Sequence, residues 1–249
     1  MSLITKISKG RQVRPLRLLV HGEGGTGKST FFSGAPDPLF IDPEQRTGHL
    51  DVTRFTPETW VELLAFMKEV ILSRPCKTLV FSTIDFMEGM VWSHLCKREG
   101  TANIEDLGGG WGKGFSMARD EFSLFLAGVE KLVSVGINVG IESHSEVETF
   151  RNPIGADFDR WNIKLHKRTR PIFIAKMDAI GFACWEDFAK KKDKTEKAAK
   201  AITTGERVLT FGHNPACQTK AGFPLPDQIP LSWAEFAKHL NTGSTKENA

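Results

Sequence analysis

The feature that most constrains the fold of this chain is a short apolar segment followed at once by a glycine-rich loop. Residues 16–21 read LRLLVH, which predicts a buried strand, and the next eight residues read GEGGTGKS. This loop matches the pattern G-x-x-x-x-G-K-[ST] in full. In such a loop the backbone N–H groups curl around phosphates, and the positive end of the following helix faces them. The sequence therefore predicts a phosphate-binding loop at residues 22–29.

Individual loop residues have separate chemical tasks in this prediction. We expect nucleotide contacts from the loop and the residue after it: Gly22, Glu23, Gly24, Gly25, Thr26, Gly27, Lys28, Ser29 and Thr30. Lys28 would neutralise charge on the β- and γ-phosphates, and the Ser29 hydroxyl would ligate Mg²⁺. A glycine-rich turn that matches by chance is the alternative, which the strand before the loop and the helix after it disfavour. The sequence thus predicts a P-loop that binds ATP or a close relative with Mg²⁺.

Strand and helix patterns alternate along the rest of the chain. Strands are expected at 39–42, 77–84, 138–142, within 172–185 and at 207–211, and helices after Lys28 and at 57–73, 86–98 and 116–135. Thr56 before Pro57 suits a helix N-cap followed by proline in the first turn. Residues 99–115 are expected to form a loop, 146–169 a long loop or a hairpin, and 190–200 a solvated helix. This alternation predicts an α/β fold with a mostly parallel central sheet flanked by helices.

The composition is that of an ordinary globular protein. The chain has 249 residues, 40% of them hydrophobic and 25% charged, enough for one large α/β domain or two small ones. No apolar run reaches the roughly 18–20 residues of a membrane-spanning helix, and no signal-peptide core follows the basic N-terminus. The four cysteines form no C-x-x-C pair, which favours reduced thiols. We therefore expect a cytoplasmic protein with no membrane partner.

Besides the P-loop, a set of short segments runs in order through residues 16–240. They are FIDPE at 40–44, GKG at 112–114, GINV at 136–139, HS at 144–145, KLHK at 164–167, DA at 178–179, PA at 215–216, Lys220, LP at 225–226 and SWAEF at 232–236. In this set the chain resembles the RecA-like ATPases of phage recombination, and more closely the AAA-type ATP-binding proteins grouped with phage single-strand annealing proteins. The resemblance implies a RecA-like P-loop NTPase core at 16–240, with an N-terminal extension at 1–15 and a flexible tail at 241–249.

The resemblance also implies roles for three residues outside the P-loop. Glu44 corresponds to the acid that polarises the attacking water; a solvated turn glutamate is the alternative. His144, with Ser145, corresponds to the sensor of the γ-phosphate that relays to a DNA-binding loop; a structural histidine is the alternative. Lys220 matches a basic residue that reaches the nucleotide across a subunit interface, and a plain surface lysine is its alternative. With Lys28, these residues form the predicted catalytic set.

Two departures from the family pattern bear on hydrolysis. The family has an aspartate that holds Mg²⁺ through water where this chain has Ser82. A neutral hydroxyl helps a divalent cation much less than a carboxylate does, and Asp85, a second acid of the motif, is not an obvious replacement. The family also has an arginine shortly after Lys220, where this chain has Ala221 and Gly222. The expected metal ligands are Ser29, Ser82 and Asp85. Because this set lacks the aspartate of the family pattern, hydrolysis is expected to be weak.

A basic cluster follows the proposed sensor strand. Lys164, Lys167, Arg168 and Arg170 lie within seven positions, after two aromatic residues. Cations near aromatic rings can contact the backbone of single-stranded DNA and stack its bases. A solvated hairpin is the alternative, but the resemblance places a DNA-binding loop here. The glycine-rich loop with Lys113 would line the same channel.

Three functions remain open from the sequence. The first is an ATPase for recombination or annealing that acts on single-stranded DNA as a homo-oligomeric ring or filament, with a phage single-strand-binding or annealing protein as partner. It would act in the host cell cytoplasm if it is phage-encoded. The second is a hydrolysis-deficient ATP-binding switch of assembly, which Ser82 favours. The third is a small-molecule kinase. It fits poorly, because such a kinase would have an arginine-rich lid after the third strand and this sequence shows none there.

Overall fold

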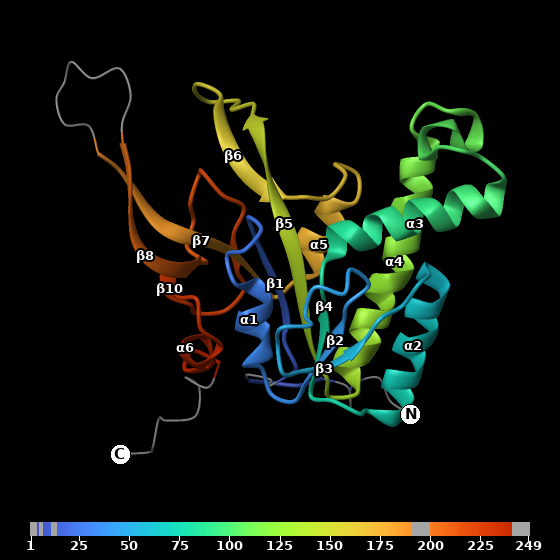
Figure 1. The fold of residues 1–249 in the computed structure, drawn as a ribbon, viewed down its shortest axis with the longest axis horizontal. Coiled ribbons are helices and arrows are strands. Elements are labelled where there is room, and N and C mark those ends of the chain that lie inside the picture. The colour runs from blue at the N-terminus through green and yellow to red at the C-terminus, as the bar shows by residue number, and fades with distance from the viewer. Residues whose placement is uncertain (1–3, 5–6, 11–13, 191–199, 241–249) are drawn as a thin grey trace.

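A mostly parallel sheet forms the centre of the molecule in the computed structural model, which describes residues 4, 7–10, 14–190 and 200–240 (Figure 1). Its parallel strands follow one another across the sheet in the order β7 (Ala179–Lys190), β1 (Arg17–Gly22), β5 (Asn138–Phe150), β4 (Thr78–Phe81), β2 (Pro38–Ile41) and β3 (Thr53–Phe55). Four strands join antiparallel: β8 (Lys200–Thr210) on β7, β10 (Gln228–Pro230) on β8, β9 (Lys220–Ala221) on β7 and β6 (Phe158–Ile163) on β5.

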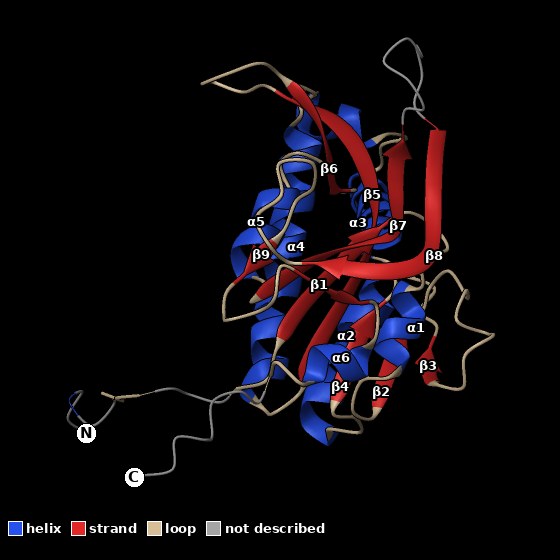
Figure 2. Ribbon diagram, turned by 90° about the vertical axis from the view of Figure 1, so that its left-hand side faces the viewer, coloured by secondary structure: helices blue, strands red, loops and turns tan. Residues whose placement is uncertain are grey.

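Helices cover both faces of this sheet, as Figures 1 and 2 show. One face carries α2 (Trp60–Ser73), α3 (Ile84–Glu99), α4 (Lys113–Ser134) and α5 (Arg170–Lys176), and the other carries α1 (Lys28–Ser33) and α6 (Trp233–Ala237). A 3₁₀ segment, η2 (Ile104–Gly109), precedes α4. The predicted fold class, a mostly parallel α/β sheet flanked by helices, is confirmed. Among the described helices, none combines the length and apolarity needed to cross a bilayer.

The apolar strand β1 is buried on both sides because helices lie above and below it. Leu19 packs into the core under α2, α3 and α4, whereas Leu18 and Val20 pack into the core under α1 and α6. Each of these three side chains is at most 1% exposed. This double burial explains why the three consecutive residues 18–20 are all apolar.

Several local expectations are corrected by the structure. Helix α2 begins at Trp60, and its N-cap is Thr59, whose side chain accepts a hydrogen bond from the Glu62 nitrogen, so the Thr56 cap is wrong. The expected loop at 99–115 contains η2 and the start of α4. Strand β5 continues beyond the expected 138–142 to Phe150 and forms a hairpin with β6, which is one of the two structures expected for 146–169. The strand expected within 172–185 is β7, and α5 precedes it. The tail 241–249 and residues 191–199 of the expected solvated helix lie outside the described residues.

The order of the strands brings the loop after β1, the residues after β4 and the end of β5 to one edge of the sheet. In parallel sheets of this kind, ligands bind beyond the carboxyl ends of the strands. Strand β5 lies between β1 and β4, with Glu142 opposite Val20 and Ile141 opposite Phe81. Residues that follow β4, such as Ser82, therefore lie near the end of β5 and the loop after β1.

Candidate functional site

The loop between β1 and α1 requires glycine at two positions. A Cβ atom at residue 22 would lie 2.2 Å from the Ala183 carbonyl oxygen of β7, and Gly27 has a φ of 99°. The first position allows β1 and β7 to approach closely, and the second needs a backbone conformation that favours glycine. The Thr26 hydroxyl also donates to the Glu23 carbonyl at 3.0 Å. Tertiary contacts and local turns together hold the loop in its curled shape.

Lys28 lies inside this curl. Its side chain is 6% exposed, and its Nζ donates to the carbonyl oxygens of Gly22 at 3.1 Å and Glu23 at 2.8 Å. Burial lowers the pKa of Lys28, while the nearby carboxylates oppose this shift. An ammonium group held by two carbonyls at the mouth of the loop is placed to meet an anion that enters it.

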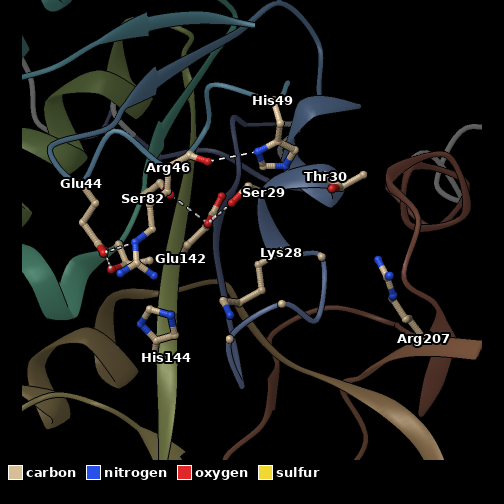
Figure 3. A pocket seen from close by; sticks show the side chains of 14 residues that line it. Lys28, Ser29, Thr30, Glu44, Arg46, His49, Ser82, Glu142, His144 and Arg207 are labelled. Atoms are coloured by element: carbon tan, nitrogen blue, oxygen red, sulfur yellow. Dashed lines mark hydrogen bonds and ion pairs between the residues drawn. The ribbon is translucent and has the colours of Figure 1, made fainter. Parts of the chain in front are cut away.

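Next to Lys28, two serine hydroxyls share one buried carboxylate (Figure 3). Ser29 Oγ donates to Glu142 Oε2 at 2.8 Å, and Ser82 Oγ donates to the same oxygen at 3.0 Å. Glu142 is 1% exposed, and its other oxygen, Oε1, is buried with no hydrogen-bond partner. Burial raises the pKa of Glu142 to about 7, although the two serine hydrogen bonds favour its ionised form.

These groups open into a pocket of about 370 Å³ at the edge of the sheet. Glu44 lines the pocket, accepts a hydrogen bond from Thr83 Oγ1 at 2.7 Å, and pairs with Arg46 Nε at 2.9 Å. On the opposite side, Arg207 of β8 lies over the Trp185 ring at 4.5 Å and approaches the loop at Gly27. The pocket therefore carries cations on two sides of the phosphate loop.

The comparison with known families agrees with this geometry. The family model of the AAA domain matches residues 14–222, from the strand before the loop to the segment after β9. The chain belongs to the AAA domain family. This membership makes the protein an AAA-type P-loop ATPase by family, with a site of the nucleotide-binding, ATP-hydrolysing type. No curated protein matches the sequence.

The AAA domain has a donor set that fits Mg²⁺ beside the loop. Among the described residues, no group of three or more His, Cys, Asp or Glu side chains can hold a metal alone. A P-loop site does not need one, because phosphate oxygens and water complete the octahedron. Ser29 Oγ and the unpaired Glu142 Oε1 are oxygen donors, the type that Mg²⁺ prefers. Magnesium bound with ATP would offset negative charge on the phosphates.

Two other acids near the pocket accept hydrogen bonds from protein donors on both carboxylate oxygens. Asp85 of α3 accepts from the His144 nitrogen at 2.9 Å and pairs with His144 Nδ1 at 2.8 Å. Burial opposes ionisation of Asp85, but the hydrogen bonds from His144 hold its pKa below the ordinary value. Asp42 accepts from the backbone nitrogens of Arg46 and Thr47 and from the Thr47 hydroxyl. In this arrangement Asp85 orients His144, which lines the pocket. The role of Asp85 as a metal ligand stays a prediction.

Lys220 does not point into this pocket. Its Nζ donates to the carbonyl oxygens of Ile174 at 2.9 Å, Ala175 at 3.2 Å and Met177 at 2.6 Å, at the end of α5. These three bonds use all three protons of the ammonium group. Its role across a subunit interface stays a prediction that would require these bonds to break.

The predicted DNA-binding residues lie partly together. Arg168 donates to the Gly112 carbonyl and to Ser116 Oγ, so the loop after β6 touches the start of α4, where Lys113 is exposed. Lys164 and Lys167 are exposed as well. Arg170 differs, because it is buried and pairs with Glu146 and Glu148 while donating to the Leu165 carbonyl. The structure thus separates an exposed basic group from a buried arginine that stabilises the hairpin.

Among the pocket residues that the sequence analysis missed are Glu142, Arg46 and Arg207. Glu142 lay at the end of an expected strand, and the signal was an acid closing the apolar run NVGI. Arg46 lies two residues after Glu44, in a turn where Glu44 was the only predicted site residue. Arg207 had no usable signal, because only the pairing of β8 with β7 brings it to the loop.

Proposed function

We propose that this AAA domain hydrolyses ATP and couples the reaction to single-stranded DNA in recombination or strand annealing, as a homo-oligomer. The proposal has two parts, an ATP site with Mg²⁺ at the phosphate loop and a DNA-binding surface. We call the second part the basic surface and define it by Trp111, Lys113, Lys164, Lys167 and Arg168.

The basic surface has the chemistry that single-stranded DNA needs. Trp111 is 99% exposed, and it directly precedes Gly112, whose carbonyl accepts a hydrogen bond from Arg168. An exposed aromatic ring can stack on a base, and the cations can follow the phosphate backbone. Tryptophan is enriched at interfaces, where its large ring supplies contact area.

The observation that carries the proposal is a continuous path of contacts from the pocket to the basic surface. His144 lines the pocket and is bonded to Asp85 of α3. One turn along α3, the Glu88 carboxylate accepts from the His166 nitrogen at 3.0 and 3.2 Å. The His166 ring stacks on Phe115 at 4.0 Å. This path supports coupling because a change at His144 would reach the loop of Lys167 through a single rigid helix.

Contiguity alone does not demonstrate coupling, so the test measures it. The rate of ATP hydrolysis is measured with and without single-stranded DNA, for the wild type and for Trp111→Ala. We expect DNA to stimulate the wild type and to stimulate the variant much less, with equal rates in the absence of DNA. Binding of ATP with no turnover under either condition would instead support the assembly switch, which Ser82 favours. Turnover that only a small-molecule phosphate acceptor stimulates would support the kinase.

The proposal includes partners and location that follow from the family resemblance. A homo-oligomer, ring or filament, would place neighbouring basic surfaces along one strand. A phage single-strand-binding or annealing protein would deliver or receive that strand, in the host cytoplasm. Sedimentation of the protein with ATP, Mg²⁺ and single-stranded DNA tests the assembly, and a particle that stays monomeric under all conditions would contradict it.

A further inference from the structure

The acid that accepts a hydrogen bond from Ser29 of the phosphate loop lies on β5 and not at the end of β4. The family pattern has an aspartate at the position of Ser82, just after β4. Because Ile141 pairs with Phe81, the next residue on β5, Glu142, lies beside Ser82. Glu142 also pairs with Val20 of β1, which puts it one strand nearer to the loop than residue 82. The carboxylate that is missing from one strand is therefore present on its neighbour.

We propose that Glu142 supplies the carboxylate that positions Mg²⁺ beside Ser29, in place of the aspartate that residue 82 lacks. This inference rests on the proposed binding of ATP at the loop. Ser29, the loop ligand of the metal, is already bonded to Glu142 at 2.8 Å, so the two oxygens are within reach of one cation. Ser82 Oγ supports the carboxylate by donating to the same oxygen, Oε2, at 3.0 Å.

The unpaired oxygen of Glu142 favours this role over a purely structural one. Both serines donate to Oε2, which leaves Oε1 buried without a partner. A buried carboxylate oxygen without a partner is costly, and a site keeps one where it serves a ligand. Asp42 and Asp85, the two other acids near the pocket, accept hydrogen bonds from protein donors on both of their oxygens. Of these three acids, Glu142 alone has an oxygen available for a cation.

The first experiment separates metal binding from nucleotide binding. The affinity for AMP-PNP is measured in EDTA and in Mg²⁺, and Mn²⁺ binding to the AMP-PNP complex is measured by electron paramagnetic resonance. Glu142→Gln should keep the wild-type affinity in EDTA, lose the gain in affinity from Mg²⁺, and bind Mn²⁺ about tenfold to a hundredfold more weakly. Asp120→Asn, at an exposed acid of α4, is the control, and it should keep the Mg²⁺ gain. Circular dichroism establishes that both variants are folded.

The second variant restores the family arrangement. Ser82→Asp combined with Glu142→Ser moves the carboxylate back to β4 and should recover the Mg²⁺ gain and Mn²⁺ binding. This double variant decides the question if Glu142→Gln does not fold. An unchanged Mg²⁺ gain in Glu142→Gln, or a double variant that folds but binds no Mn²⁺, overturns the proposal. A wild type that binds AMP-PNP neither in EDTA nor in Mg²⁺ would instead overturn the proposed function itself.

Discussion

Asp85 on α3 and His144 on β5 are joined twice, through the backbone nitrogen of His144 at 2.9 Å and through its ring Nδ1 at 2.8 Å. An ionised carboxylate can only accept hydrogen bonds, so Nδ1 carries the proton. The pair fixes the orientation of a histidine that lines the phosphate pocket. It also connects that histidine to the helix that holds Glu88.

Removal of this link should uncouple the two sites. Asp85→Ala is expected to keep ATP affinity within about twofold, because the residue makes no bond to the loop, and to abolish stimulation of hydrolysis by single-stranded DNA. Rates with and without DNA measure the effect, and Asp120→Ala, which removes an exposed acid of α4, is the control. Full DNA stimulation in Asp85→Ala would show that the path of contacts carries no coupling.

Lys28 is expected to be essential for nucleotide binding and dispensable for folding. Lys28→Ala removes a buried ammonium group that bonds only to loop carbonyls. Loss of a charge-assisted bond to phosphate should reduce ATP affinity more than about tenfold. Titration calorimetry measures the affinity, and a thermal melt that matches the wild type establishes the fold. Unchanged affinity would mean that the phosphates do not bind at this loop.

Arg207 is expected to contact the nucleotide from within the same chain. It lies over Trp185 and beside the loop, which presets its guanidinium at the pocket. Arg207→Ala should weaken ATP binding roughly twofold to tenfold, a modest effect because the group is exposed. Arg119→Ala, which removes an exposed arginine of α4 paired with Asp120, should change nothing. Equal affinities in both variants would assign Arg207 to the Trp185 contact alone.

The basic surface should determine how DNA binding depends on salt. Replacing Lys164 and Lys167 by alanine removes two exposed cations, and should reduce the slope of log K against log salt by about 1.4 for a single strand. Alanine at Lys68 and Lys131, exposed residues of α2 and α4, is the charge-matched control. Fluorescence anisotropy at several salt concentrations gives both slopes. Equal slopes would mean that the two lysines are merely solvated.

Glu88 is expected to make folding stability depend on pH. Burial raises the pKa of Glu88 from 4.5 to about 7, and the charges of Asp85 and Glu146 add to the shift. A folded-state pKa above the unfolded value means that the native state loses stability as the pH rises from about 4.5 to about 7. The stability of Glu88→Gln relative to the wild type should therefore increase across this window, by up to about 3 kcal/mol.

Urea unfolding at pH 5 and pH 8 measures this difference for Glu88→Gln. Glu142 also has a pKa of about 7 and contributes to the wild-type curve in the same window, but it is present in both proteins and cancels in the comparison. Glu69→Gln, an exposed acid of α2, is the control and should show no such trend. A constant stability difference between pH 5 and pH 8 would mean that Glu88 titrates normally.

The phosphate loop and the fold class could be predicted from the sequence because both depend on patterns of neighbouring residues. The GEGGTGKS motif needs only the strand before it and the helix after it, and residues 18–20 of β1 are all apolar because both faces of the strand are covered. Alternating strand and helix patterns likewise restrict the chain to a parallel sheet with crossover helices. Local periodicity was sufficient for these conclusions.

The tertiary structure alone decided which side chains share the pocket. Ser82 and Glu142 are 60 residues apart in the sequence and meet because β4 and β5 are neighbours in one register. Arg207 reaches the loop because β8 pairs antiparallel with β7, and no sequence motif predicts this pairing. Arg170 reads as one more exposed cation, yet two glutamates of the β5 hairpin bury it. Strand order and register bring distant residues together, and a pattern confined to neighbouring residues carries no information about either.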